Sequence, residues 1–215
     1  MILDLHVHSV YSVDSPVRPE EYARRMVELR ADYDLSGFVL MEHNYLLKKK
    51  ECDLYELSRE YGLVILAGVE VDTFWGHLLV YGMPKGLWLK IEDSGTRKQE
   101  PVKLAREVEA EDGALVPAHP FRGFIGAGVR CKNLPGVRAI ETLNGANSEE
   151  ENDAAIKYAA KEGLAATGGS DAHFLGELGN ALTRFSSPIR DMQGLTREIR
   201  AGRCQAITLE EAKKK

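Results

Sequence analysis

The feature that most constrains the fold of this chain is a repeated alternation of short apolar runs with amphipathic segments. The apolar runs are nearly continuous and rich in β-branched residues, which is typical of strands covered on both faces. Glycine, proline and polar clusters separate the two kinds of segment. We predict strands in "MILDLHVHS", "SGFVLMEH", "LVILAGVEV", "HLLVYGMP", "ALVPAHP", "VRAIETLNG", "LAATGGSDAH", "ALTRFSSP" and "CQAIT".

Segments with helical spacing follow several of these strands. Pro19 favours a helix start, and Ser148 with Glu151 forms a capping-box pattern. Loops are expected in the polar "EDSGTRKQ" and in the glycine-rich "FRGFIGAGVRC", which lacks the Lys-Ser/Thr ending of a nucleotide P-loop. We predict helices in "PEEYARRMVELRADYD", "ECDLYELSREYG", "PVKLAREVEAEDG", "SEEENDAAIKYAAKEG" and "MQGLTREIRAG".

The alternation predicts an α/β fold with a parallel sheet, in a single domain covering residues 1–215. A chain of 215 residues is long enough for one sizeable core. Polar residues close nearly every predicted strand. This favours a barrel over an open doubly wound sheet, because a barrel gathers its strand ends at one rim.

All six histidines lie at the ends of predicted strands, and only His77 stands where a strand begins. At the C-terminal rim of parallel strands, side chains that are far apart in sequence converge. A lone histidine at a strand end is usually a hydrogen-bonded structural residue, but the joint placement of all six indicates ligands. The histidines are His6, His8, His43, His77, His119 and His173.

Acidic residues repeat this placement, with Asp14, Glu70, Glu141 and Asp171 at or just after strand ends. His6 and His8 stand two residues apart, and so do Asp171 and His173. In a strand, each of these pairs would lie on one face. Imidazole and carboxylate ligands together suit Zn, Mn or Fe. So many ligands exceed the coordination of one ion, which predicts two or three divalent metal ions with bridging carboxylates.

Composition excludes several other classes of protein. The formal net charge of -5 argues against tight binding of a nucleic-acid backbone, which requires concentrated Lys and Arg. The cysteines Cys52, Cys131 and Cys204 are far apart, so we expect free thiols in a reducing compartment. No apolar stretch approaches the roughly 20 residues of a membrane span. We therefore expect a soluble, cytoplasmic protein with no membrane partner.

Six segments, in their order along the chain, resemble the motifs of the PHP (polymerase and histidinol phosphatase) superfamily. They are "DLHVHSVYSVDS", "MEHN", "GVEV", "WGHLLVYG", "AHPFRG" and "GGSDAH", and the resemblance extends from Asp4 to about Thr183. The segment "SDAHFLGELGNALTRF" is also similar to the PHP-associated C-terminal segment of short, stand-alone members, which we place at about 184–215. The resemblance implies a distorted (β/α)7 barrel that hydrolyses phosphoester bonds at a metal site on the C-terminal rim of its strands.

The resemblance also implies which residues bind the metals. One departure from the family pattern is Met41-Glu42-His43, where the family usually has Thr-Asp-His. Glu42 is expected to point away from His43, so the ligand set is expected to survive the change. The implied ligands are His6, His8, Asp14, His43, Glu70, His77, His119, Asp171 and His173.

Clustered divalent metals would lower the pKa of a bound water to about 7 and neutralise charge on the phosphoryl oxygens. Metal-activated hydroxide would then attack the ester, and no cysteine or serine nucleophile is needed. Asp14, Asp171 or a ligand histidine would pass a proton to the leaving oxygen. Arg122 is our candidate for a phosphate clamp, because a guanidinium matches two phosphate oxygens; a solvated loop arginine is the alternative.

Four residues beside the predicted ligands are candidates for supporting roles. Glu141 and Asn144 in "ETLNG" could orient ligand imidazoles. Phe74 and Trp75 could stack on a ring of the substrate, although an aromatic pair beside an apolar strand is more often part of the core.

The leading prediction is a metal-dependent phosphoesterase that acts on a small phosphorylated metabolite or nucleotide. An exonuclease or 3′-phosphoesterase that trims short nucleic acid is the alternative within the same chemistry. An amidohydrolase-like enzyme would require a bridging lysine, and no predicted strand ends in lysine. A non-catalytic metal-binding regulatory domain is the remaining alternative, and the intact set of candidate ligands argues against it.

Overall fold

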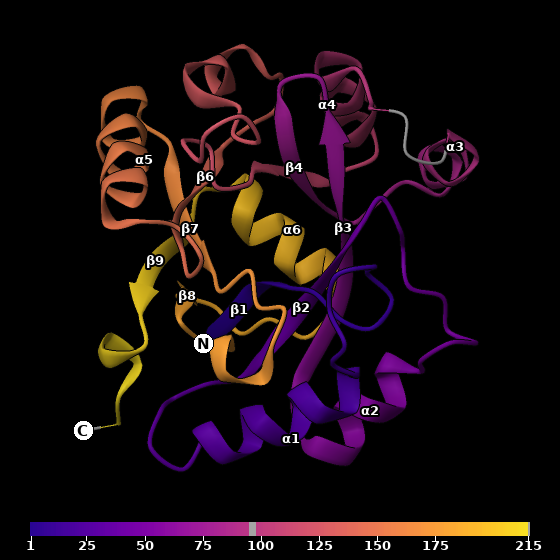
Figure 1. Cartoon of the computed structure of the whole chain (residues 1–215), viewed down its shortest axis with the longest axis vertical. Coiled ribbons are helices and arrows are strands. Elements are labelled where there is room, and N and C mark those ends of the chain that lie inside the picture. The colour runs from indigo at the N-terminus through magenta and orange to yellow at the C-terminus, as the bar shows by residue number, and fades with distance from the viewer. Residues whose placement is uncertain (95–97, 215) are drawn as a thin grey trace.

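The computed structural model describes residues 1–94 and 98–214, which form two sheets surrounded by helices (Figure 1). The larger sheet has seven strands in the order β5-β4-β3-β2-β1-β8-β9, and β6 and β7 form the second sheet. The strands are β1 (Ile2–Val7), β2 (Gly37–His43), β3 (Val64–Thr73), β4 (Gly76–Tyr81), β5 (Ala114–Pro117), β6 (Ala139–Asn144), β7 (Ala165–Gly169), β8 (Ala181–Phe185) and β9 (Cys204–Thr208).

The strands that carry the predicted ligands lie side by side. β1, β2 and β3 are parallel neighbours, so their C-terminal ends lie at the same edge. β6 and β7 are also parallel, and the chain just after β7 forms a parallel bridge from Ala172 to Val7 at the end of β1. The second sheet therefore lies against β1, and its C-terminal end reaches the same rim.

The predicted α/β class is confirmed, but the predicted distorted (β/α)7 barrel is not. Only Phe74 and Trp75 join β3 to β4, and such a short connection forces an antiparallel pair, because a parallel return needs a crossover. β5, β8 and β9 also pair antiparallel with their neighbours. The result is a curled seven-stranded sheet beside a separate parallel pair (Figure 1).

Every predicted helix is present, and one helix was missed. The capping box of Ser148 and Glu151 is formed at the start of α5. We expected a connection without secondary structure after β4, but α3 occupies most of it. Part of the loop predicted at 92–99 falls on residues 95–97, which lie outside the described residues. The helices are α1 (Pro19–Leu29), α2 (Leu54–Tyr61), α3 (Lys85–Ser94), α4 (Pro101–Ala110), α5 (Glu149–Glu162) and α6 (Met192–Arg200), with short 3-10 turns η1 (Gly128–Asn133), η2 (Leu175–Glu177) and η3 (Glu210–Ala212).

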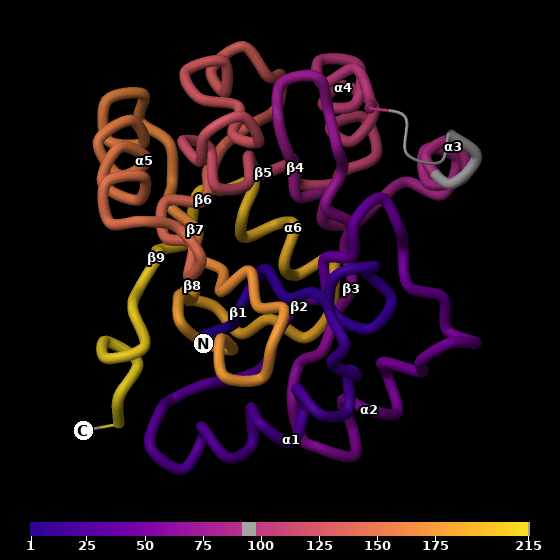
Figure 2. Tube along the Cα trace, in the orientation of Figure 1, coloured from indigo at the N-terminus to yellow at the C-terminus, as the bar shows by residue number. Residues whose placement is uncertain are grey.

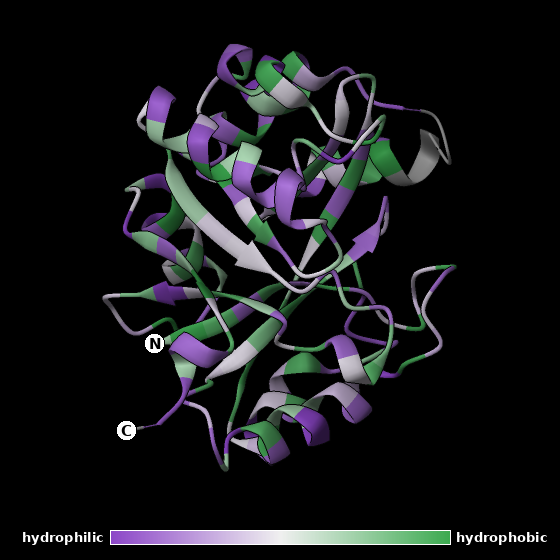
Figure 3. Ribbon diagram, turned by 60° about the vertical axis from the view of Figure 1, so that its left-hand side comes forward, coloured by the Kyte–Doolittle hydropathy of each residue, from purple (hydrophilic) through white to green (hydrophobic). Residues whose placement is uncertain are grey.

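The helices cover the sheets through their apolar faces. α1 and α2 run side by side at the lower end of the molecule, α5 lies beside β6 and β7, and α6 lies behind the larger sheet (Figures 1 and 2). α6 contributes Leu195 and Ile199 to a buried cluster with Leu3, Leu5 and Leu79. Hydrophobic residues follow the strands, whereas most helices carry both hydrophobic and hydrophilic residues (Figure 3). This packing fixes the strand ends that carry the site.

The three cysteines are free thiols, as predicted. Within the described part of the chain, no helix combines the length and the apolar character needed to cross a membrane.

Candidate metal centre

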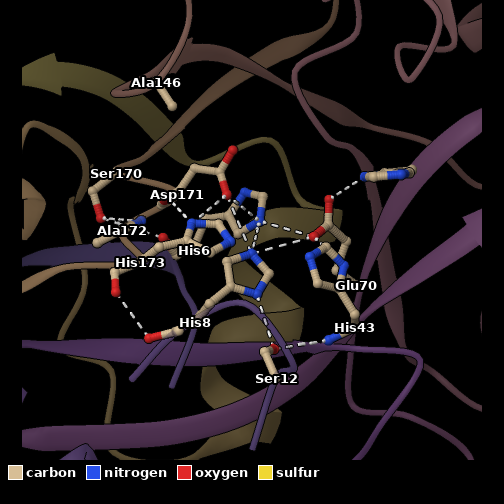
Figure 4. A network of polar contacts seen from close by, with 12 residues as sticks. His6, His8, Ser12, His43, Glu70, Ala146, Ser170, Asp171, Ala172 and His173 are labelled. Atoms are coloured by element: carbon tan, nitrogen blue, oxygen red, sulfur yellow. Dashed lines mark hydrogen bonds and ion pairs between the residues drawn. The ribbon is translucent and has the colours of Figure 1, made fainter. Parts of the chain in front are cut away.

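The innermost part of the site is formed by His6 and His8 on β1 together with Asp171, which follows β7. The Nε2 atoms of the two histidines lie 3.0 Å apart, which brings their ring nitrogens to one point. Asp171 Oδ1 lies 3.2 Å from Nε2 of His8 and 3.5 Å from Nε2 of His6. All three side chains are buried. Figure 4 shows them pointing toward one another from two neighbouring strand ends.

Glu70, near the end of β3, lies between the histidines. Its Oε2 atom lies 3.4 and 3.3 Å from Nε2 of His6 and His8. Its Oε1 atom lies 2.9 Å from Nδ1 of His77 and 3.1 Å from Nε2 of His119. One carboxylate therefore faces imidazoles through both oxygens, which is the geometry of a bridging ligand.

The outer part of the site is open to solvent. Asp14 Oδ2 lies 3.2 Å from Nε2 of His43 and 3.2 Å from Nε2 of His173. The Asp14 side chain is 46% exposed, and the two histidines are about a quarter exposed. The structure thus brings all nine predicted ligand residues together, with a buried inner set and a solvent-facing outer set.

The donor set fits divalent metal ions. Three overlapping groups of ligand atoms each lie within 4.8 Å of one another, and His8 and His43 each belong to two of the groups. Glu70 Oε2 is buried and accepts no hydrogen bond in the described structure, which is costly unless a cation faces it. Imidazole nitrogen and carboxylate oxygen are the ligands of Zn, Mn and Fe sites.

Hydrogen bonds at the far ring nitrogens orient the imidazoles. His6 Nδ1 lies 3.0 Å from Oε1 of Glu141, so this nitrogen carries the proton and Nε2 is left for a metal. His173 Nδ1 donates to the backbone oxygen of Asp171 at 2.9 Å, with the same result. The contact predicted for Glu141 is therefore present, and Asn144 reaches the site by donating to the carboxylates of Glu141 and Asp171.

Glu42, the departure from the family pattern, is buried on the other side of the strand from the metal centre. Its carboxylate accepts hydrogen bonds from Ser9 N at 3.0 Å and from the hydroxyl of Ser12 at 2.6 Å. The Ser12 oxygen in turn lies 3.3 Å from Nδ1 of His8 and accepts the backbone N–H of His43 at 3.2 Å. Glu42 thus holds the loop after β1 and acts on the site only through Ser12.

Arg122 is engaged by side chains around Asp171. Its Nη1 donates to Oδ2 of Asp171 at 2.7 Å, its Nε donates to Oδ1 of Asn147 at 2.6 Å, and its Nη2 donates to Oδ1 of Asn144. Asp171 therefore turns Oδ2 to the guanidinium and Oδ1 to the histidines. These contacts make Arg122 a positioning residue for Asp171; its role as a phosphate clamp stays a prediction.

Opposite charges inside the site shift several pKa values. Burial lowers the pKa of His8, but the nearby carboxylates of Asp171 and Glu70 outweigh burial and raise the pKa to about 9. Burial is likewise outweighed at His6, whose pKa lies well above its usual value because of Asp171, Glu141 and Glu70. The histidines hold the pKa of Glu70 well below its usual range despite burial. The buried carboxylates need compensating positive charge, which protons or metal ions can supply.

The backbone is strained at two predicted ligands. Four non-glycine residues among those described have positive φ, and His119 at 27° and Asp171 at 55° are two of them. Such angles cost of order 1–3 kcal/mol and tend to persist where a site requires them. Each of the two residues stands two positions after the end of a strand at the rim, so the strained angle turns its side chain into the cluster.

Sequence reasoning missed several partners of the ligands. Ser12 and Asn147 lie in loops, and no spacing rule connects them to a strand face. Asp72, whose Oδ1 lies 3.3 Å from Nε2 of His77, did carry a signal. It stands two residues after Glu70 on β3, so strand alternation places both on one face.

A family model matches the C-terminal part of the chain. Residues 149–204, from the start of α5 to the start of β9, match the family described as PHP-associated, which confirms the resemblance to the PHP superfamily. Fold and site together define an α/β protein with a cluster of candidate metal-ligating side chains. A comparison with curated proteins finds no match.

Solved structures share the fold at low sequence identity. PsfC from Pseudomonas syringae has a TM-score of 0.66 and 18% identity over 98% of this chain and 92% of its own. A candidate metal-dependent phosphoesterase from Bifidobacterium adolescentis has a TM-score of 0.64 and 17% identity, over 93% and 96%. The lesion-specific endonuclease PfuEndoQ from Pyrococcus furiosus has a TM-score of 0.63 and 17% identity, over 96% of this chain and 58% of its own.

Proposed function

We propose that this protein is a metal-dependent phosphoesterase that hydrolyses a phosphate ester of a small metabolite or nucleotide. The observation that carries the proposal is the Glu70 carboxylate, buried among imidazoles with one oxygen that accepts no hydrogen bond. Such a carboxylate between histidine ligands supports a cluster of two or three Zn, Mn or Fe ions. When bound, these ions would activate water and neutralise phosphoryl charge.

The protein's own side chains have separable tasks in this reaction. Asp171 is unsuited to donate a proton, because its neighbours hold its pKa far below the usual range in spite of burial. Asp14 is half exposed on the open side of the cluster, so we assign it the transfer of a proton to the leaving oxygen. Arg122 holds Asp171 in place.

A small substrate is favoured over a long nucleic acid. The chain carries a net charge of -5 and so lacks the surplus of Lys and Arg that neutralises a phosphate backbone. The most exposed candidate ligands, Asp14, His43 and His173, are also acidic or imidazole side chains. A nuclease or 3′-phosphoesterase acting on short oligonucleotides is the alternative that the experiment must separate.

The test is phosphate release by purified protein of known metal content. The panel contains nucleoside monophosphates, histidinol phosphate, a chromogenic diester and short oligonucleotides, and His8→Ala is the control variant. Turnover that requires Mn, Zn or Fe and is lost in the variant is the expected result. Absence of turnover from fully metallated protein would refute the proposal in favour of a non-catalytic metal-binding domain.

A further inference from the structure

The first half of β3 has an open edge. On one side, β3 pairs with β2 along residues 64–70, but on the other side β4 pairs with it only from Val69 onward. The register would place Gly82 opposite Ala67, but Gly82 has a positive φ of 70° and turns the chain away from the sheet after β4. The edge of β3 before Val69 therefore has no partner strand among the described residues.

The backbone groups on this edge differ in their partners. Val64 N donates to Ser36 O on the β2 side at 2.9 Å. Since alternate residues of a strand direct their N–H and C=O groups to opposite edges, Ile65 and Ala67 face the open edge. The hydroxyl of Ser58 accepts from Ile65 N at 3.2 Å and donates to Ile65 O at 3.3 Å. Ala67 has no such partner in the described part of the chain, so its N–H and C=O are accessible to a ligand.

A groove of about 750 Å³ runs along this edge. Residues 63–67 line it consecutively, which indicates that it follows the edge of the strand, because side chains alternate between the two faces. Its other walls are formed by α2 and by residues 190–192 at the start of α6. Its volume lies within the roughly 300–1,000 Å³ of small-ligand sites.

Three arginines from three different parts of the chain line the groove. They are Arg30 just after α1, Arg59 on α2 and Arg190 just before α6. Arg190 is exposed and forms no ion pair or hydrogen bond with the described residues. Asp191, the acidic residue of the lining, is engaged as the N-cap of α6. The groove therefore has surplus positive charge in a chain of net charge -5, and guanidinium groups match carboxylate and phosphate oxygens.

The groove also offers apolar surface. Val64, Leu66 and Ala67 are partly exposed, although β3 lies inside the sheet. The ring of Tyr55, on the α2 wall, is 67% exposed. Arginines around an apolar floor suit a ligand that combines an anionic group with an apolar body.

We propose that this groove binds a small organic anion, with a carboxylate or phosphate group held by the arginines and an apolar body packed along the edge of β3. The site is separate from the metal centre, because Val64 and Glu70 lie about 20 Å apart along the strand at ~3.3 Å per residue. A second copy of the chain is disfavoured as the occupant, because a twofold interface would bring a second set of three arginines into the same groove.

The test titrates benzoate and phenylphosphonate into isotope-labelled full-length protein, with and without added zinc, and follows the amide resonances. We expect at least one of the two anions to bind, with the largest shifts around Ala67 and Arg190 and no dependence on zinc. Arg190→Gln should weaken this binding about 10- to 100-fold, because a charge-assisted hydrogen bond is lost. Arg24→Gln is the matched control, because Arg24 is likewise exposed but lies on α1 outside the groove, and the affinity should stay unchanged.

Several results would overturn the inference. Benzamide binding as tightly as benzoate would show that the charge is not recognised, and inorganic phosphate binding as tightly as phenylphosphonate would show the same for the apolar body. Shifts confined to the metal centre, or binding that requires zinc, would place the anion on the metal ions. A hexaglutamate peptide that binds when both small anions fail would indicate an acidic protein partner instead. None of these readouts depends on hydrolysis, so failure of the proposed phosphoesterase function would leave this inference standing.

Discussion

The hydroxyl of Ser12 fixes the protonation of His8, and its removal should weaken metal binding. Ser12 has one hydroxyl proton, which it donates to the Glu42 carboxylate at 2.6 Å. Its oxygen must then accept the proton on Nδ1 of His8, at 3.3 Å, so Nε2 is the nitrogen left for a metal. Ser12→Ala would remove this acceptor and leave buried polar groups without partners.

The size of the effect follows from these contacts. Loss of a partner that orients a ligand imidazole typically reduces metal affinity about 10- to 100-fold, or about 1.4–2.7 kcal/mol. Each buried group left unsatisfied costs a further ~1–3 kcal/mol of folding free energy. In the variant, Nδ1 of His8, the N–H of His43 and one Glu42 oxygen lose their bonds to Ser12. Both metal affinity and stability should therefore fall.

The assay is calorimetric titration of metal-depleted protein with Mn or Zn, together with thermal unfolding. Ser15→Ala is the matched control from the same loop, because the Ser15 hydroxyl is similarly buried and donates to the backbone oxygen of His173 at 2.9 Å instead of contacting an imidazole. We expect Ser15→Ala to lose stability while keeping most of its metal affinity. A folded Ser12→Ala protein that binds metal within twofold of the wild type would refute this reasoning.

Three further predictions test other parts of the structure. A Cβ added in Gly169→Ala would lie 2.4 Å from Cβ of His6, so we expect a loss of about 1–3 kcal/mol in unfolding free energy together with weaker metal binding. The control is Gly176→Ala, where an added Cβ has no atom within 4 Å, and its unfolding free energy should change by less than about 0.5 kcal/mol. Chelation should lower the melting temperature of the metal-loaded protein, since metal at ~100 times its Kd stabilises by ~2.7 kcal/mol, and an unchanged melting temperature would contradict a folded-state metal site. Hydrogen bonds from Arg203 at 2.9 and 2.7 Å lower the pKa of Glu198, so this pair stabilises the fold above the ordinary pKa of 4.5, and its contribution is lost as pH falls through the lowered pKa. The free energy of unfolding should therefore fall less steeply with decreasing pH in Glu198→Gln than in the wild type. Identical pH profiles would exclude the pair as a cause of acid destabilisation.

Local pattern predicted the elements well but not the way in which they connect. Continuous apolar runs identified the strands because those strands are covered on both faces. The barrel prediction was not confirmed at the β3–β4 turn, although only five residues separate the two predicted strands, which is too few for the crossover that a parallel pair needs. Helix α3 was missed beside a polar segment, yet Leu87, Trp88 and Ile91 are buried at helical spacing and carried the signal.

The clustering of the candidate ligands could be predicted because strand topology brings their positions together. Parallel strands end at one edge, so His43 and Glu70 meet once β2 and β3 pair in register. The contacts that orient the ligands depend on loop conformation instead. Arg122 contacts Asp171 because the loop after β5 changes direction at His119, where φ is positive. This change of direction cannot be predicted from local sequence patterns.

The candidate ligands differ in how firmly the protein holds them. Inner ligands are fixed by dedicated partners: Glu141 supports His6, Ser12 supports His8 and Arg122 supports Asp171. Asp14, on the open side, forms ion pairs with two other candidate ligands, His43 and His173. A rigid inner set can bind metal without reorganisation, whereas a half-exposed carboxylate can move with its proton and exchange it with solvent. We therefore expect the proposed reaction to take place on the Asp14 side, which is the solvent-facing side of the cluster.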